Sequence, residues 1–117
     1  MSTQYQDLTK QISANLAPLH KSQPAVMKSF GEMGKAAMAA GTLDVKTKEL
    51  IALAVGVVAR CDGCIGFHTK TLVRLGASTE EVHEALGIAV YMGGGPAAMY
   101  AANAVASFEE FLTAAQA

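Results

Sequence analysis

The sequence predicts an all-α protein, folded as a compact bundle of about six helices. Apolar residues recur every three or four positions through most of the chain, which is the helical period. Ser78-Thr79-Glu80-Glu81 is a capping box, a pattern that begins helices. Few runs alternate between apolar and polar residues as half-buried strands do. With 117 residues, the chain is expected to form one domain over residues 1–117, large enough to bury a core.

The N-terminal part of the chain predicts two amphipathic helices. An apolar stripe predicts the first helix over residues 3–17, before Pro18. His20 is then expected in a loop. The second helix begins around Pro24, which suits a first helical position, and runs toward Gly41 as its C-terminal cap. Its methionines stand at helical spacing, so we expect them in the core.

A third helix is predicted to begin at Asp44, whose side chain can accept hydrogen bonds from the first free N–H groups. The ten residues 50–59 have no polar side chain, so this helix is expected to be apolar on all sides and buried. Its β-branched residues also permit a buried strand, and a strand followed by CxxC and a helix would resemble thioredoxin. The length of the run and the absence of tryptophan favour the helix.

Three further helices are predicted in the second half of the chain. One runs from Cys61 to Gly76, and the capping box at Ser78 begins the next. The glycines at 93–95 are expected to form a tight interhelical turn, and Pro96 to begin the sixth helix. The glycine run lacks the remaining residues of a phosphate-binding loop.

Charge and composition limit the class of protein. A formal net charge of −1 offers no extended cationic field, so no nucleic-acid partner is expected. The N-terminus lacks the features of a signal peptide, and no run approaches the roughly 20 apolar residues of a membrane span. We therefore expect no membrane association and, with two cysteines at CxxC spacing, a cytoplasmic location. The chain is 51% apolar and only 16% charged, which indicates a homo-oligomer.

Both cysteines lie in one short stretch. If a helix begins near Cys61, then Cys61, Cys64 and His68 share one of its faces. Two thiols and an imidazole on one face suit redox chemistry or metal binding. The positive end of the helix would stabilise a thiolate at Cys61, whereas the imidazole would act as a base toward Cys64.

A carboxylate is the expected third member of such a group. Glu49 is the preferred candidate, because it stands at the head of an apolar helix where an unpaired carboxylate is costly. A solvated first-turn position, favoured by the helix dipole, is the alternative for this residue. A working relay requires the helix that carries His68 to fold back antiparallel on the preceding one, so that His68 approaches Glu49 directly or through a water.

The spacing of these residues resembles a known signature. Glu49 precedes Cys61-Asp62-Gly63-Cys64 by twelve positions and His68 follows, which is similar to the E-x11-C-x-x-C-x3-H pattern of AhpD-like alkylhydroperoxidases in the carboxymuconolactone decarboxylase family. The similarity covers roughly residues 43–103. Members of that family often carry a histidine where this chain has Gly63.

The resemblance implies an all-α fold and a peroxidase cycle that needs no cofactor or metal. By this analogy Cys64 attacks the hydroperoxide and becomes a sulfenic acid, and Cys61 condenses with it to a disulfide. Glu49 and His68 would be the proton relay of Cys64. A dithiol reductant, such as a lipoyl-bearing or thioredoxin-like protein, would restore the thiols, and the subunits would form trimers or hexamers.

The same residues also fit other functions. The same cysteines would serve a general thiol-disulfide oxidoreductase without a dedicated peroxide. Zinc would also accept Cys61, Cys64 and His68 as ligands. Only these three are close in sequence, so a closed structural site would need a fourth ligand from elsewhere in the chain, for which His83 is the candidate. A lactone decarboxylase is disfavoured because that chemistry does not call for a paired thiol. A helical module whose cysteines merely pack is the last alternative.

Overall fold

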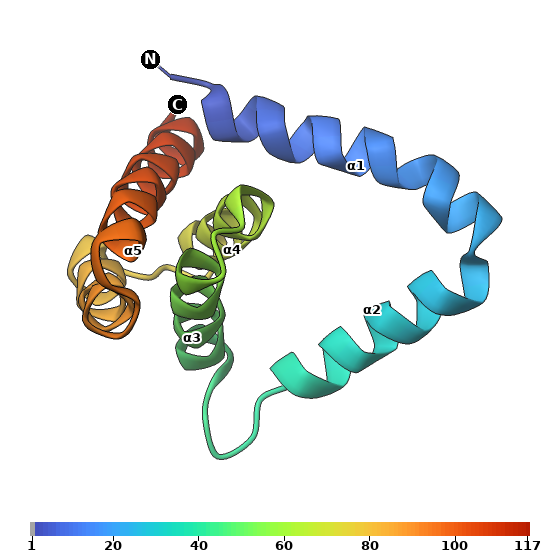
Figure 1. The fold of residues 1–117 in the computed structure, drawn as a ribbon, viewed down its shortest axis with the longest axis horizontal. Coiled ribbons are helices and arrows are strands. Elements are labelled where there is room, and N and C mark those ends of the chain that lie inside the picture. Colours follow the sequence, from blue (N-terminus) through green and yellow to red (C-terminus); the bar gives the residue numbers. More distant parts are fainter. Residues whose placement is uncertain (1) are drawn as a thin grey trace.

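The computed structural model of the protein describes residues 2–117, and these residues form five helices without a strand (Figure 1). The all-α prediction is confirmed. The number of helices differs slightly from the expected six, for a reason that lies in the glycine run of the last helix.

The five helices form two regions. The bundle consists of α3 (Val45–Val58), α4 (Asp62–Arg74) and α5 (Thr79–Gln116), which pack closely on one another. The N-terminal arm consists of α1 (Gln4–Ser22) and α2 (Pro24–Met38) and runs around one side of the bundle (Figure 1). The start of α1 and the last part of α5 lie close together (Figure 1), and the backbone N–H of Gln6 donates to Glu110 Oε1 at 2.8 Å.

The core lies where the three helices of the bundle meet. Its largest fully buried apolar side chains all come from these helices: Leu53, Val57, Ile65, Leu72, Val82 and Phe108. Two buried hydroxyls, of Thr69 on α4 and Ser107 on α5, form a hydrogen bond of 2.6 Å across the core. That bond satisfies polar groups whose burial would otherwise be costly.

The helix starts follow the local signals in the sequence. Asp44 accepts the backbone N–H of Thr47 at 2.8 Å, as predicted for the cap of α3. Ser78 Oγ accepts the N–H of Glu81 at 3.1 Å, and Glu81 Oε1 accepts the N–H of Ser78 at 2.9 Å. The predicted capping box at the start of α5 is confirmed.

The glycine run does not separate two helices, so the sixth predicted helix is the second half of α5. Gly94 alone departs from helical geometry, with φ of 75° and ψ of −155°. Glycine adopts this left-handed φ without steric cost, which allows the chain to kink and continue. Pro96 then stands two residues beyond the kink, where its missing N–H falls in the first turn of the new segment.

The prediction that the first helix stops before Pro18 is wrong. α1 continues through Pro18 to Ser22, and His20 lies in its last turn rather than in a loop. An interior proline removes one backbone hydrogen bond, and the helix bonds normally beyond it: the N–H of Gln23 donates to the carbonyl of Leu19 at 2.8 Å.

The expectation that the methionines of the second helix lie in the core is also wrong, because α2 has no buried residue. Three of its apolar side chains are more than half exposed and form a stripe here called the α2 stripe: Val26, Phe30 and Met33. The helix ends at Met38 rather than near Gly41. Lys48 holds this end, since its Nζ donates to two carbonyls there, at 2.9 and 2.6 Å.

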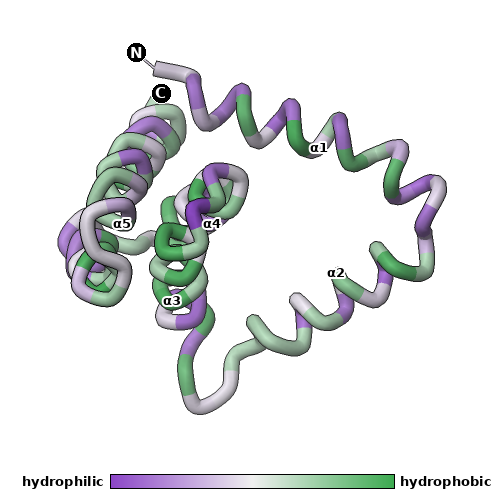
Figure 2. The backbone as a smooth tube through the Cα atoms, in the orientation of Figure 1, coloured by the Kyte–Doolittle hydropathy of each residue, from purple (hydrophilic) through white to green (hydrophobic). Residues whose placement is uncertain are grey.

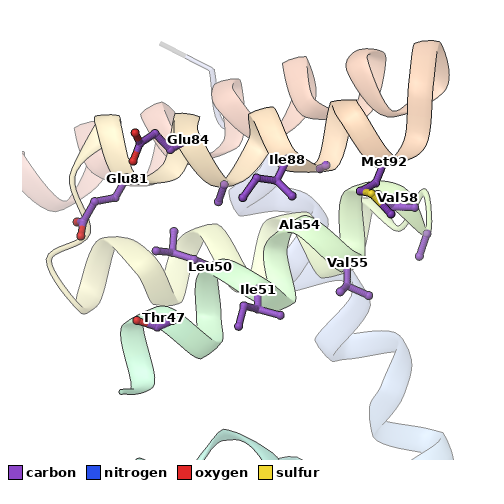
Figure 3. A pocket seen from close by; sticks show the side chains of 13 residues that line it. Thr47, Leu50, Ile51, Ala54, Val55, Val58, Glu81, Glu84, Ile88 and Met92 are labelled. Carbon is purple, nitrogen blue, oxygen red and sulfur yellow. The ribbon is translucent and has the colours of Figure 1, made fainter. Parts of the chain in front are cut away.

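The third helix is not buried on all sides, contrary to expectation. Figure 2 shows α3 as strongly apolar after its first turn, yet Ile51 and Val55 are exposed. They line an open apolar groove of about 720 Å³ between α3 and α5, opposite Ile88 and Met92 (Figure 3). No helix within residues 2–117 combines the length and apolarity needed to cross a membrane.

Candidate active site

The two cysteines lie at the N-terminus of α4, as predicted. Cys61 is the N-cap residue, and its sulfur accepts the backbone N–H of Cys64 at 3.1 Å. The two sulfurs form a disulfide, with 5.2 Å between the Cα atoms. Arg60, with a positive φ of 59°, reverses the chain between α3 and α4. This reversal places the CxxC turn, residues 61–64, against the end of α3.

Close packing with α3 determines where Cys64 lies. A Cβ atom at Gly56 would come within 3.0 Å of Cys64 Cβ. Any larger residue at position 56 would therefore push Cys64 away from α3. The N–H of Cys61 donates to the carbonyl of the same Gly56 at 3.0 Å, so one glycine supports both cysteines.

The antiparallel packing of α3 and α4 brings Glu49 and His68 together. His68 Nδ1 and Glu49 Oε2 lie 2.6 Å apart, which is a direct contact without a bridging water. Glu49 is only 8% exposed, so it occupies a buried paired position and not the solvated one that the sequence left open. We assign the proton to Nδ1, which donates to the carboxylate and leaves Nε2 as the basic nitrogen. The catalytic roles of the two residues stay a prediction.

The space next to Gly63 is filled by the N-terminal arm. A Cβ at residue 63 would lie 2.8 Å from Ile12 Cδ1, and one at Gly66 would lie 2.7 Å from Thr9 Cγ2. The two glycines, one turn apart on α4, let α1 approach this helix closely. A histidine at position 63 would require Ile12 to move. The departure from the family pattern at Gly63 thus matches the way α1 packs here.

Sequence reasoning missed one polar contact of the site. The hydroxyl of Tyr5 donates to Asp62 Oδ1 at 3.0 Å, across 57 positions of sequence. Burial, followed by the hydrogen bond and charge of Asp62, raises the pKa of Tyr5 well above its usual range. Tyr5 was visible in the sequence only as part of an apolar stripe. Nothing local indicates that its hydroxyl reaches the CxxC turn.

The other candidate ligands do not join the site. His83 is exposed on α5, and among residues 2–117 no three histidine, cysteine or acidic side chains converge as metal ligands would. The metal-binding alternative therefore has no ligand cluster to rest on in this part of the chain. The apolar groove between α3 and α5 contains none of the four predicted site residues in its lining: Glu49, Cys61, Cys64 and His68.

Comparison with known proteins agrees with this architecture. A sequence model described as the carboxymuconolactone decarboxylase family matches residues 24–107. An uncharacterised protein of Cupriavidus necator is 41% identical over 109 residues, which cover 93% of this chain and 96% of that protein.

Solved structures give the same result. An apo carboxymuconolactone decarboxylase family protein from Legionella pneumophila superposes with a TM-score of 0.93 at 52% identity, covering 95% of this chain and 99% of that one. A family protein from Thermotoga maritima, whose description suggests without asserting a part in the antioxidative response, has a TM-score of 0.82 at 35% identity, with 92% of each chain covered. Sequence and fold agree over nearly the whole length, and the protein belongs to the carboxymuconolactone decarboxylase family.

Proposed function

We propose that this protein is a thiol-dependent peroxidase of the AhpD-like type, which reduces hydroperoxides through a Cys61–Cys64 disulfide cycle. One observation carries the proposal: a cysteine pair close enough to form a disulfide lies one helical turn before an imidazole held by a buried carboxylate. A nucleophile, a base and a group that orients the base are the parts of an activated nucleophile. The antioxidative suggestion attached to the Thermotoga maritima relative agrees with this function.

The cycle follows from these parts. His68 Nε2 takes the proton of the Cys64 thiol, and Glu49 stabilises the resulting imidazolium through Nδ1–H. The Cys64 thiolate attacks the terminal oxygen of the hydroperoxide, the O–O bond breaks, and an alcohol leaves after protonation. Cys64 is then a sulfenic acid. Cys61 attacks its sulfur, water leaves, and the disulfide seen in the structure forms.

The cycle needs a reductant that supplies two electrons and two protons. A dithiol carrier, such as a lipoyl-bearing or thioredoxin-like protein, would attack the disulfide and leave oxidised itself. Such a cycle suits a reducing compartment, which supports a cytoplasmic location.

A general thiol-disulfide oxidoreductase is the second candidate function, and one contact favours it. Cys61 caps α4 and its sulfur accepts a backbone N–H. The same position would stabilise a thiolate at Cys61, which would then be the more acidic thiol and the attacking one. The two candidates therefore assign the nucleophile to different cysteines.

We also propose that the protein self-associates, as a trimer or hexamer, with the α2 stripe of one copy seated in the α3–α5 groove of another. Both surfaces are apolar, and no part of residues 2–117 covers either of them. One pair of charges is complementary: α2 carries Lys35, and the exposed Glu84 lines one end of the groove (Figure 3). Lys28 and Glu81, the other charged residues of these two surfaces, already pair with Glu32 and Lys46 of the same chain.

The test is the reaction of the reduced protein with hydrogen peroxide and with an organic hydroperoxide. Wild type should lose two thiols per chain. Cys64→Ser should abolish the reaction, and Cys61→Ser should stop it at a sulfenic acid that a dimedone probe traps. His68→Ala and Glu49→Gln should slow it by about 10²-fold or more, the usual scale of a lost general base. His83→Ala, an exposed histidine outside the site, is the matched control and should leave the rate unchanged.

The second candidate makes the opposite prediction. If Cys61→Ser is inert while Cys64→Ser forms a mixed disulfide with an added aromatic disulfide, Cys61 is the nucleophile and the peroxidase assignment fails. Lack of reaction with both hydroperoxides by a fully reduced, folded wild type would also exclude it.

A further inference from the structure

The CxxC turn is held by the N-terminal arm as well as by the bundle. Tyr5, in the first turn of α1, is 3% exposed, and its hydroxyl donates to Asp62 Oδ1 at 3.0 Å. Asp62 stands between the two cysteines, directly after the N-cap Cys61. The contact thus joins a buried hydroxyl of the arm to the one acidic residue within the CxxC turn.

Packing against α4 holds Tyr5 in this position. The methyl group of Thr9, one turn further along α1, also lies against Gly66 of α4. The ring lies against α4, where its Cδ1 would be 3.5 Å from a Cβ at Gly66. Asp62 is different, because it is exposed. Without the hydroxyl, its carboxylate would be free to take other rotamers in solvent.

The direction of the Asp62 carboxylate matters for the cysteines. A carboxylate near a thiol opposes formation of the thiolate, since two negative charges repel. A hydrogen bond from a neutral hydroxyl holds the charged group in one direction and reduces its field. Here that direction is toward α1.

We propose that Tyr5 is a positioning residue for the Cys61–Cys64 dithiol, whose hydroxyl holds the Asp62 carboxylate toward α1 and so limits its opposition to thiolate formation. The biological meaning rests on the proposed function, because a hydroperoxide reacts with a thiolate and not with a thiol. The groups that face Tyr5 from the other helices are Asp62 on α4, and Glu110 and Tyr100 on α5; all three raise the pKa of Tyr5. The hydroxyl therefore remains protonated, and a donor, wherever the thiols titrate.

The test measures the pKa of the thiols in the reduced full-length protein, from thiolate absorbance and from the rate of alkylation by iodoacetamide against pH. Tyr5→Phe removes only the hydroxyl. It should raise the pKa of the more acidic thiol by about 0.5 to 1 and slow alkylation at neutral pH about three- to tenfold. Tyr91→Phe makes the same chemical change at an 85% exposed position and should alter neither.

Asp62→Asn separates an effect of charge from an effect of packing. The amide oxygen still accepts from Tyr5, but the negative charge is gone, so this variant should lower the thiol pKa. In the Asp62→Asn background, adding Tyr5→Phe should have no further effect on it.

Several outcomes would overturn the proposal. One is an unchanged thiol pKa in folded Tyr5→Phe. Another is that Tyr5→Phe raises the thiol pKa by the same amount in the Asp62→Asn background as in wild type, which would show that Tyr5 does not act through that carboxylate. If Tyr5→Phe does not fold, an unchanged thiol pKa in Asp62→Asn alone is enough. These measurements use no hydroperoxide, so failure of the peroxidase function would leave their result intact.

Discussion

The bundle and the N-terminal arm bury very different parts of themselves. The large, fully buried apolar side chains all lie in α3, α4 and α5. In the arm, α1 contributes two buried residues, Tyr5 and Thr9, and α2 contributes none. The buried pair of α1 lies against α4, beside the CxxC turn.

This difference separates two tasks. The bundle builds the core and carries Glu49, Cys61, Cys64 and His68. The arm adds little core but touches the CxxC turn through α1 and leaves the α2 stripe exposed. A chain that keeps a weakly packed arm with an exposed apolar stripe is expected to use that surface for contact with another molecule.

The largest expected effect is a difference in the free energy of unfolding when one phenylalanine of each region is truncated to alanine. Phe108 of the bundle is 1% exposed and Phe30 of α2 is 65% exposed. Phe108→Ala should lower the free energy of unfolding by about 3 to 5 kcal/mol, because it leaves a cavity in the core. Phe30→Ala should lower it by less than about 1 kcal/mol in the monomer, where the ring is already in water. Urea unfolding at high dilution, with the mass checked, measures both. Equal losses would show that the arm is part of the core after all.

The contact between α1 and α4 can be strained at Gly66. In Gly66→Ala the new Cβ meets Thr9 Cγ2, and Thr9 is held by hydrogen bonds from its hydroxyl to two carbonyls of α1. The expected loss of stability is about 1 to 3 kcal/mol, the usual cost of overpacking. Gly63→Ala is the matched control and should cost less, because Ile12 Cδ1 is the end of a flexible side chain. The reverse order would mean that α1 does not lie against α4 as described.

The part of the α2 stripe in self-association is tested by introducing a charge there. Phe30→Glu should weaken self-association at least tenfold, about 1.4 kcal/mol or more, since a carboxylate would be buried in an apolar groove. Lys10→Glu places the same side chain at an exposed position of α1, outside the α2 stripe and the groove, and should leave the association unchanged. Light scattering across a dilution series reports the mass. A wild type that is monomeric at every concentration would exclude the proposed interface.

The smallest expected effect is the contribution of Tyr5 to the loss of stability at alkaline pH. Tyr5 has a raised pKa when folded, whereas an unfolded tyrosine ionises near pH 10. Unfolding therefore releases a proton above about pH 10, so the stabilisation is complete below that pH and is lost as the pH rises further. The slope from this residue is at most about 1.4 kcal/mol per pH unit. The free energy of unfolding, measured by chemical denaturation on both sides of pH 10, should fall less steeply with pH in Tyr5→Phe than in wild type. In Tyr91→Phe it should fall as in wild type. Parallel curves for Tyr5→Phe and wild type would contradict the buried environment of this tyrosine.

The candidate site was partly visible before the structure. Helical spacing placed Cys64 and His68 on one face, and the need for a partner pointed to Glu49, which the structure finds 2.6 Å from His68. Tyr5 could not be found in this way. Its contact with Asp62 joins residues 57 positions apart, and neither residue carries a local signal for the other.

The errors in the fold have the same origin. The methionines of α2, and Ile51 and Val55 of α3, have the right spacing and hydropathy for a core, yet they are not buried, because burial depends on whether another helix covers them. Gly94 shows a second kind of error: a glycine run permits a turn, but the packing of both halves of α5 decides that the chain only kinks.

Signals that act within one helical turn are therefore readable from the residues alone. The caps at Asp44 and Ser78, the start of α4 at the CxxC turn and the helical class of the chain are of this kind, because each hydrogen bond involved spans three or four positions. Which apolar faces meet, how α3 and α4 bring Glu49 to His68, and how Tyr5 reaches Asp62 depend on tertiary packing. These contacts are made between segments far apart in the chain, and only the free energy of the whole fold selects them.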